Sequence, residues 1–472
     1  MRPGPYILNQ NHNSILQRRI MKNVIYIHPK TPMTYPRNIP ISLPALIKRI
    51  PAEVKGYCAT QITDNQIRQA DIVIVDIHWF FSLKGAGELV KRIRRIKKEI
   101  VIISGGITST EFPGKLINDL DIDFVIRGDG EIPLPMLVEL LVTGVGDMGS
   151  IPNLVGKNGV DNTFRKPYKL DKEDFNQNHF YDIDFFPFMK NELQLIHKIN
   201  PGMPPYVYPF LLPFRGCPIA CDFCSGAYGE QQKLFNRKVV YRSPEVLAGD
   251  IEFLGSQSWI KFCNCLLDFV ALLPHQYSEV VLKKKSRLNI QYEFTKAPMA
   301  DELEFLLSGF SGGTIHFSVD NMHLTSENHY NPAVLAPLIK KVQRTKSYVA
   351  ILDFSSVYTL TNKDYARAVA DVYKTTKCLL YDGSIWWSDF PKPGMNGYGD
   401  PDKFEYFKEN AVSTNHLIAN TLNKTINELD KILPPPVLRY LRKSYYRYYH
   451  GYSFLLKNNI ASRFKLAPYQ EQ

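Results

Sequence analysis

The chain has 472 residues and a formal net charge of +11 at pH 7, a length that is enough for two or three domains with cores of their own. The basic balance permits an anionic substrate or nucleic acid, but no long basic block requires either. No uninterrupted apolar run approaches twenty residues, and the N-terminus lacks the apolar segment of a signal peptide, so we expect no membrane partner. Seven cysteines, an odd number with a tight cluster, favour a reducing cytoplasmic location over a disulfide framework.

Residues 1–20 are a polar extension, and residues 21–165 alternate apolar strands with helices. We expect strands at 24–28, 71–77, 100–104 and 123–127, and helices at 42–49, 84–97 and 134–141. This alternation predicts an α/β fold, a doubly wound Rossmann-like parallel sheet with helices on both faces. Ligands of such sheets bind at the carboxyl ends of the strands. Two glycine turns lie there, Ser104-Gly105-Gly106 and Gly128-Asp129-Gly130-Glu131.

The rest of the chain divides into a connector, a second α/β domain and a tail. Residues 166–205 are aromatic and charged, which indicates an anchored inter-domain connector rather than a free linker. Residues 206–400 contain at least five strand–helix alternations, which predict a full or partial TIM-like (β/α) barrel with its site at the carboxyl ends of the strands. Residues 401–472 begin as a helical region and end in a basic aromatic tail.

Three cysteines, Cys217, Cys221 and Cys224, fall within the single run RGCPIACDFC. A tight loop with this C-x3-C-x2-C spacing can turn its thiolates toward one soft metal centre. A structural zinc site usually needs a fourth ligand, which Cys263 or Cys265 could supply, and the chain would then be a structural metal-binding protein. Otherwise the last two cysteines are buried packing residues. Three ligands alone would leave one iron of an iron–sulfur cluster open.

The spacing C-x3-C-x-aromatic-C, with Phe223 as the aromatic residue, resembles the cluster loop of radical S-adenosylmethionine (SAM) enzymes. The resemblance implies that Cys217, Cys221 and Cys224 ligate a [4Fe-4S] cluster whose open iron binds SAM. It also implies that an external one-electron reductant feeds the cluster, which cleaves SAM to a 5′-deoxyadenosyl radical.

Motifs after the cysteines follow the order of the radical SAM barrel. YRSPE, IHFSVDN and DFPKPGMNGYG resemble segments of that barrel, in sequence order. The resemblance implies cofactor-binding roles for polar residues at successive strand ends: Asp268, Glu293, Lys296, Ser318 and Asp320. From the residues alone, three of these have plainer interpretations: Asp268 as a helix cap, Glu293 as a solvent-facing strand residue and Asp320 as part of a turn.

The segments SGGITSTEFP and DFVIRGDGE resemble the cobalamin-binding domain that precedes the barrel in one class of radical SAM proteins. The resemblance implies that cobalamin is a cofactor and that its nucleotide tail contacts Ser104, Gly105, Gly106, Thr108 and Gly128. The motif D-x-H-x-x-G, whose histidine replaces the lower cobalt ligand in many cobalamin proteins, does not follow the first strand. The lower ligand is therefore open.

The loop His78-Trp79-Phe80 leaves the carboxyl end of the strand at 71–77, where the corrin ring should lie. Asp76-Ile77-His78 begins a D-x-H-x-x-G match, but Phe81 occupies the glycine position, so we interpret the match as coincidence. The rings either cap the core or pack against the lower corrin face. Packing without coordination would favour transfer of a methyl radical.

The resemblance as a whole implies a cobalamin-dependent radical SAM methyltransferase. We expect it to methylate an unactivated carbon of a peptide or protein side chain, or of a small natural-product precursor. The alternative within the class is cyclisation or rearrangement without methyl transfer. Methylthiolation of RNA fits less well, because Cys58 is the only cysteine of the N-terminal domain. The tail at 438–456 could contact a peptide, pack as an amphipathic helix or meet nucleic acid, and the last is the least favoured.

Overall fold

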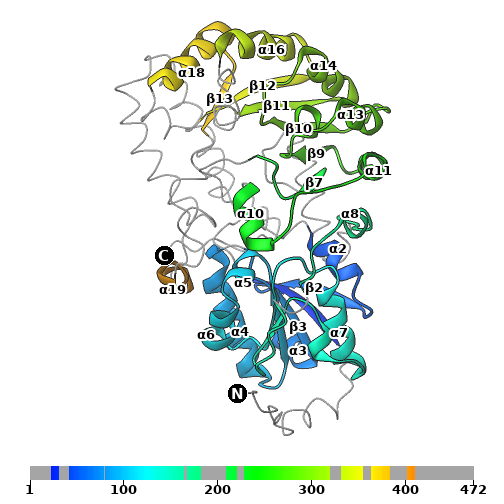
Figure 1. The fold of residues 1–472 in the computed structure, drawn as a ribbon, viewed down its shortest axis with the longest axis vertical. Helices are drawn as coiled ribbons and strands as arrows, with labels where there is room; N and C mark the ends of the chain where they lie inside the picture. Colours follow the sequence, from blue (N-terminus) through cyan, green and yellow to red (C-terminus); the bar gives the residue numbers. More distant parts are fainter. Residues whose placement is uncertain are drawn as a thin grey trace, which may run out of the picture.

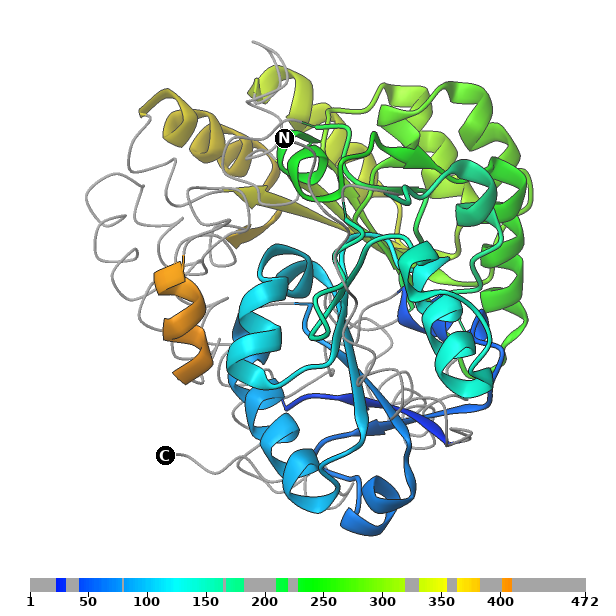
Figure 2. The same ribbon diagram turned by 60° about the horizontal axis from the view of Figure 1, so that its bottom comes forward.

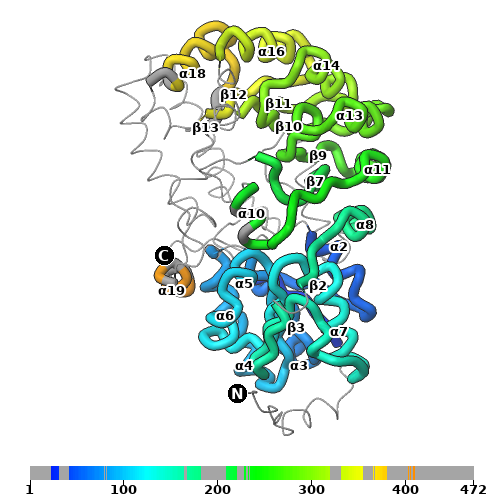
Figure 3. The backbone as a smooth tube through the Cα atoms, viewed as in Figure 1, coloured from blue at the N-terminus to red at the C-terminus, as the bar shows by residue number. Residues whose placement is uncertain are grey.

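The computed structural model describes residues 23–30, 42–78, 80–163, 167–181, 209–219, 228–318, 331–354, 363–382 and 401–409. Two α/β units follow each other along the long axis of the molecule: the N-terminal unit in blue and cyan, and the later unit in green and yellow (Figure 1). The tube view shows the same two units and the α10 segment between them (Figure 3).

The N-terminal unit is built on a six-stranded sheet of order β2-β1-β3-β4-β5-β6. Its strands are β1 (Val24–His28), β2 (Val54–Cys58), β3 (Ile72–Asp76), β4 (Val101–Gly105), β5 (Phe124–Ile126) and β6 (Leu154–Gly156). The first five strands in this order, β2, β1, β3, β4 and β5, are parallel to their neighbours, whereas β6 pairs antiparallel with β5. The second strand and the third lie on opposite sides of β1, so the chain order switches direction there. This is the doubly wound sheet that the sequence predicts, with an antiparallel edge that it does not.

Helices cover both faces of this sheet, as Figure 2 shows in a second view. One apolar core takes residues of α3, α4 and α6, and a second core on the opposite face takes residues of α2 and α7. The helices are α2 (Leu43–Lys48), α3 (Asp64–Gln69), α4 (Leu83–Ile96), α5 (Ile107–Glu111), α6 (Pro113–Leu120) and α7 (Pro133–Thr143), with 3-10 turns η1 (Phe80–Ser82) and η2 (Met148–Ser150). All the strands predicted for this unit are present.

The second unit contains a parallel five-stranded sheet of order β13-β12-β11-β10-β9. Its strands are β9 (Phe262–Cys265), β10 (Asn289–Phe294), β11 (Gly312–Ser318), β12 (Tyr348–Phe354) and β13 (Leu379–Asp382). Its helices are α10 (Tyr228–Phe235), α11 (Pro244–Ser256), α12 (Phe269–Leu272), α13 (His275–Val281), α14 (Ala300–Gly309), α16 (Pro332–Arg344) and α18 (Lys363–Thr376). The sequential strand order is that of a (β/α) barrel.

The segment before Cys217 adds to the free edge of this sheet. Phe210 forms a parallel bridge with Asn264 of β9, and the Leu211 amide donates to the Asn264 carbonyl at 2.7 Å. The cysteine loop therefore follows the first barrel strand, as predicted. Outside the barrel sheet, strand β8 (Val240–Tyr241) pairs antiparallel with β7 (Phe214–Arg215).

The connector is anchored by one buried arginine. Arg242 donates to the Phe175 carbonyl at 2.6 Å and to the Asn178 carbonyl at 2.9 Å, and pairs with Asp250 at 2.9 Å. Its guanidinium also lies 4.9 Å from the centre of the Phe180 ring. Helix α8 (Lys172–Asn176) is thereby held on the barrel. The RSPE segment thus has a structural role at its arginine.

Helix α19 (Pro401–Glu409) returns to the N-terminal unit, beside α4 and α6 (Figure 1). The Phe404 side chain is fully buried there, with its ring centre 5.2 Å from that of Phe112. Lys115 and Lys408 pair with Glu405 around it. The rest of the predicted C-terminal helical region and the aromatic tail lie outside the described residues. Within the described part of the chain, no helix combines the length and apolar character that a membrane span needs.

Replacing Phe404 by Ala is expected to undock α19. Truncating a fully buried phenylalanine costs about 3–5 kcal/mol, so amide hydrogens of residues 401–409 should exchange much faster. Lys408→Ala is the matched control, because a partly exposed ion pair contributes only about 0–1 kcal/mol. Equal exchange rates in the two variants would contradict the docking.

Candidate functional site

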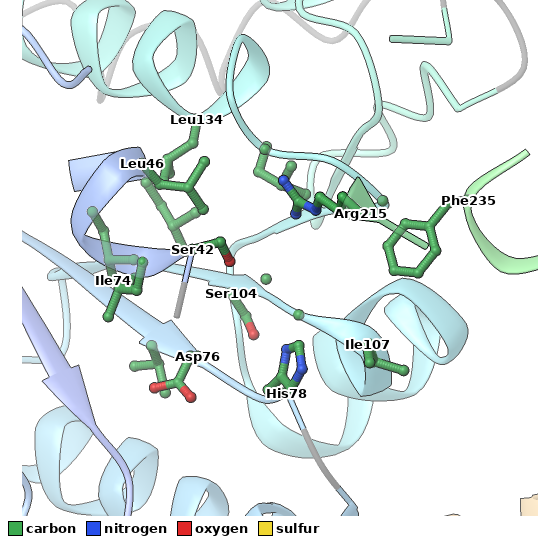
Figure 4. A pocket seen from close by; sticks show the side chains of 18 residues that line it. Ser42, Leu46, Ile74, Asp76, His78, Ser104, Ile107, Leu134, Arg215 and Phe235 are labelled. Atoms are coloured by element: carbon green, nitrogen blue, oxygen red, sulfur yellow. The ribbon is translucent and has the colours of Figure 1, made fainter. Parts of the chain in front are cut away.

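A cavity of about 90 Å³ opens at the carboxyl ends of β3, β4 and β5 (Figure 4). Its wall is mostly apolar, with a few polar groups and one arginine. The lining residues are Ser42, Leu43, Leu46, Ile74, Val75, Asp76, His78, Ile103, Ser104, Gly105, Gly106, Ile107, Ile126, Gly128, Gly130, Leu134, Arg215 and Phe235. The last two come from the barrel side of the molecule, and the rest from the N-terminal unit.

Four residues predicted from the two glycine turns line this cavity: Ser104, Gly105, Gly106 and Gly128. Gly106 has φ of +114°, and a Cβ placed on it would come within 2.8 Å of the His78 Cα. Only glycine fits this position without strain. The turn therefore brings bare backbone to the cavity.

Thr108, predicted with the same turn, lies behind the cavity wall. It is fully buried, and its hydroxyl donates to the His78 carbonyl at 3.4 Å. It supports the loop that carries His78 and does not line the cavity itself.

The His78 ring faces the cavity below Ser104 (Figure 4). Burial lowers its pKa to about 4, and the positive charge of Arg215 adds to this effect, whereas the carboxylate of Asp76 opposes it. At neutral pH the ring is therefore uncharged. Trp79 lies outside the described residues.

A buried polar triad lies beneath the cavity. His28 Nδ1 is 2.9 Å from Asp76 Oδ1 and 3.1 Å from the Tyr26 hydroxyl, which itself donates to Asp76. The histidine that ends the first strand thus pairs with the carboxylate that ends the neighbouring strand. The sequence motif search missed this pair, because its members lie 48 residues apart.

Cys217 begins the predicted cluster loop and is half-buried. Gly216, with φ of +95°, bends the backbone just before it. Burial raises the pKa of the Cys217 thiol, and the charge of Glu293 raises it further. The cysteine and the end of β10 therefore share one environment. Cys221, Phe223 and Cys224 lie outside the described residues.

Three neighbouring barrel strands place a polar cluster at their carboxyl ends. The Ser318 hydroxyl donates to Glu293 and lies 3.4 Å from an Asp353 oxygen. His316 Nδ1 is 2.9 Å from Asp353, and its Nε2 is 3.2 Å from the Gln291 amide nitrogen. The strand register explains the meeting, because Glu293 is paired with His316 and Ser318 with Asp353.

Burial and the charge of Asp353 raise the pKa of Glu293 to about 7. Burial alone would lower the pKa of His316, but the charge and hydrogen bonds of Asp353 raise it overall. Both shifts therefore favour the protonated forms of Glu293 and His316. Sequence reasoning selected Glu293 and Ser318 but missed His316 and Asp353, although His316 stands inside the IHFSVDN segment.

The other predicted barrel residues differ in their positions. Asp268 is fully buried and caps α12: it accepts from the Ala271 amide at 2.9 Å and from the Tyr292 hydroxyl at 2.8 Å. Its contacts are those of a helix cap, and burial raises its pKa to about 7. Lys296 is exposed in the turn after β10. Asp320 lies outside the described residues.

Cys263 and Cys265 are fully buried in the apolar core of the barrel. The Cys265 thiol donates to the Leu267 carbonyl at 3.2 Å. Across the described ranges, no three His, Cys, Asp or Glu side chains gather closely enough to hold a metal ion. Both cysteines therefore pack as core residues.

A buried ion network joins the cavity to the cluster loop. Asp129 and Glu131 of the second glycine turn pair with Arg215 and Arg237 of the barrel side. From the sequence, only Gly128 of this turn is expected to contact a cofactor, and no role is predicted for Asp129 or Glu131. Arg215, which stands two residues before Cys217 in the run RGC, is the residue that could have indicated this network from the sequence.

Comparisons with solved structures identify the fold. No family model and no curated protein matches the sequence. The structure resembles the radical S-adenosylmethionine methyltransferase TsrM from Kitasatospora setae with tryptophan substrate and a SAM analog bound, at 14% identity and a TM-score of 0.54, over 79% of this chain and 75% of TsrM. A TsrM structure with cobalamin and [4Fe-4S] cluster bound matches with a TM-score of 0.52.

A second similar structure is the cobalamin-dependent SAM radical enzyme OxsB with aqua-cobalamin and SAM bound. It is 15% identical, with a TM-score of 0.53 over 86% of this chain and 57% of OxsB. The chain therefore spans less than two thirds of OxsB. These likenesses confirm the predicted fold class, an α/β chain with a Rossmann-like domain followed by a TIM-like barrel.

Gly106→Ala is expected to destabilise the chain by about 1–3 kcal/mol, because the added Cβ meets backbone atoms at a positive φ. Gly114→Ala is the control. It lies in α6 with no atom within 4 Å of its added Cβ, so alanine should be neutral or stabilising there. Urea unfolding of both variants measures the difference. A harmless Gly106→Ala would contradict the close approach.

His78 is expected to make the chain less stable in acid. The pKa of His78 is about 4 in the folded chain and about 6.5 in the unfolded chain, so the unfolded chain binds a proton first as pH falls. The free energy of unfolding therefore decreases as pH falls from about 7 to 4. Over this pH range the free energy of unfolding of the wild-type chain should fall by up to about 3 kcal/mol more than that of His78→Asn. Unfolding measured at several pH values tests this. A constant difference between the two proteins would show that His78 is not held neutral.

Proposed function

We propose that the chain is a cobalamin-dependent radical SAM methyltransferase that methylates an unactivated carbon. One observation supports this most strongly. The cavity predicted from the glycine turns lies at the carboxyl edge of the first sheet, and an ion network joins its rim to the strand that leads into Cys217. The fold shared with TsrM and OxsB supports the same assignment.

The cavity suits the nucleotide tail of cobalamin. Its apolar wall, with Leu46, Ile103 and Leu134, can bury a flat aromatic base. Gly105 and Gly106 allow backbone to approach a bulky ligand closely. The uncharged His78 ring lies at the mouth of the cavity, where it can pack against the corrin without adding a buried charge.

The barrel suits a cluster and SAM. Cys217, Cys221 and Cys224 are the proposed cluster ligands, and Phe223 completes the loop. Glu293 and Ser318 lie at strand ends near Cys217, where they can hold polar groups of SAM. Lys296 and Asp320 follow the same strand ends, while Asp268 keeps the turn after β9 in shape through its cap.

Bound together, the cofactors supply cleavage of SAM and carriage of the methyl group. The protein residues orient the groups and exclude water. With its pKa raised to about 7, Glu293 can hold or release a proton near neutral pH, so the barrel can keep its buried charges balanced when the cationic SAM enters.

The proposed substrate is a peptide or protein side chain, or a small natural-product precursor, with an external one-electron reductant as partner. We also propose a cytoplasmic location, because an oxygen-sensitive cluster suits a reducing compartment.

Anaerobic reconstitution tests the function. The chain is produced with hydroxocobalamin, iron and sulfide, and then incubated with SAM, a reductant and candidate peptides or small molecules. We expect one four-iron cluster, retained cobalamin, and formation of both 5′-deoxyadenosine and S-adenosylhomocysteine. Cys217→Ala should abolish both cluster binding and 5′-deoxyadenosine, because it removes a ligand.

Two outcomes would overturn this assignment. Deoxyadenosine without S-adenosylhomocysteine, in the presence of a converted substrate, would indicate cyclisation or rearrangement instead of methyl transfer. Zinc without iron would indicate a structural metal site. Cys263→Ser is the matched control, since this buried core cysteine should leave the metal content unchanged.

A further inference from the structure

The turn Gly128–Glu131 presents alternate residues to two different places. Gly128 and Gly130 line the cavity of the N-terminal unit. Asp129 and Glu131 instead face the barrel side, where they contact two arginines. One short turn therefore touches both candidate cofactor sites.

The contacts form a buried network of balanced charge. Glu131 pairs with Arg215, and Asp129 pairs with Arg237 at 2.7 Å and with Arg215 at 3.5 Å. The two carboxylate side chains are 0% and 1% exposed, and the Arg237 side chain is 4% exposed. Carboxylates this deeply buried need cationic partners, so the network specifies one arrangement of the turn and the two arginines. We call these four side chains the clasp.

The clasp also fixes the backbone that enters the cluster loop. Arg215 is the last residue of β7, two positions before Cys217. Arg237 donates to the Arg215 carbonyl at 3.0 Å and lies close to Gly216. A shift of the turn would therefore shift the start of the cysteine loop.

The connector is gathered by the same carboxylates. The Leu170 amide donates to Asp129 at 3.2 Å, and the Asn178 side chain donates to Glu131 at 3.2 Å. Three separate stretches of chain thus meet at one turn of the N-terminal unit.

We propose that the clasp fixes the strand that leads into Cys217 against the cobalamin cavity, and that Arg215 and Phe235 form a barrel-borne part of the cobalamin site. This inference rests on the proposed function. Asp129, Glu131 and Arg237 are positioning residues, whereas Arg215 and Phe235 also line the cavity. Because the coupling is reciprocal, cobalamin in the cavity should rigidify residues 209–219 and 228–241, and an intact clasp should slow cobalamin release.

The test uses Glu131→Gln, which keeps the shape of the side chain but removes its charge. Asp174→Asn is the matched control: Asp174 pairs with Arg49 at 3.2 Å and also joins the N-terminal unit to the connector, without lining the cavity. Both variants are reconstituted with iron, sulfide and hydroxocobalamin. The release of cobalamin and the magnetic coupling between cob(II)alamin and the reduced cluster are then measured.

For Glu131→Gln we expect release about tenfold faster or more, and a weakened or more heterogeneous coupling signal. The control should stay within about twofold of the wild type. A merely structural role would lower thermal stability in both variants but leave the coupling signal of the loaded protein unchanged. That result, or equal release rates, would overturn the inference.

A second measurement needs no variant. Saturating the wild-type chain with hydroxocobalamin should slow amide hydrogen exchange in 209–219 and 228–241 as well as around Ser104–Gly106. Protection confined to the N-terminal unit would contradict the inference while leaving cobalamin binding intact. A wild-type chain that retains no cobalamin would contradict the proposed function itself, and this inference with it.

Discussion

The buried ion network of Asp129, Glu131, Arg215 and Arg237 is the constraint that joins the two halves of this molecule. Apolar cores stabilise the two sheets, but they do not fix the strand that leads into Cys217 against the cavity. Buried carboxylates and guanidinium groups fix this arrangement, because a buried charge that loses its partner costs more free energy than a lost apolar contact. The relative placement of the two candidate cofactor sites therefore depends on charge as well as on burial, whereas the sheets depend mainly on burial.

Within the N-terminal unit, backbone conformation shapes the cavity. Gly106 turns the chain at a positive φ with no room for a side chain, and the ring of His78 is held uncharged beside it. In the barrel, strand register gathers Glu293, Ser318 and Asp353 into one polar cluster. Each site is thus positioned by the rigid part of its own sheet. In the proposed function, the bound cofactors would carry out the chemical steps.

Much of this architecture could be predicted from the sequence. Continuous apolar runs identify β1, β3, β4 and β5, and the glycine turns after β4 and β5 locate the cavity. The sequence does not predict the edge strands β2 and β6: β2 (VKGYC) mixes polar and apolar residues, and β6 (LVG) is too short to show a periodic signal. The contacts between distant residues were also missed. His28 with Asp76, His316 with Asp353 and the clasp all depend on strand register and on the packing of separate units, which no local pattern contains. For Asp268 the sequence left two interpretations open, a cofactor-binding residue and a helix cap, and the structure shows the contacts of a cap.

The most direct test of the account is anomalous X-ray scattering from a crystal of the reconstituted chain, with data collected at the cobalt, iron and zinc absorption edges. The account predicts cobalt at the carboxyl edge of the first sheet, above the cavity lined by Ser104 and Gly106, and a compact four-iron peak at Cys217 on the facing side of the clasp. A zinc peak at Cys217, or cobalt bound away from the cavity, would contradict it.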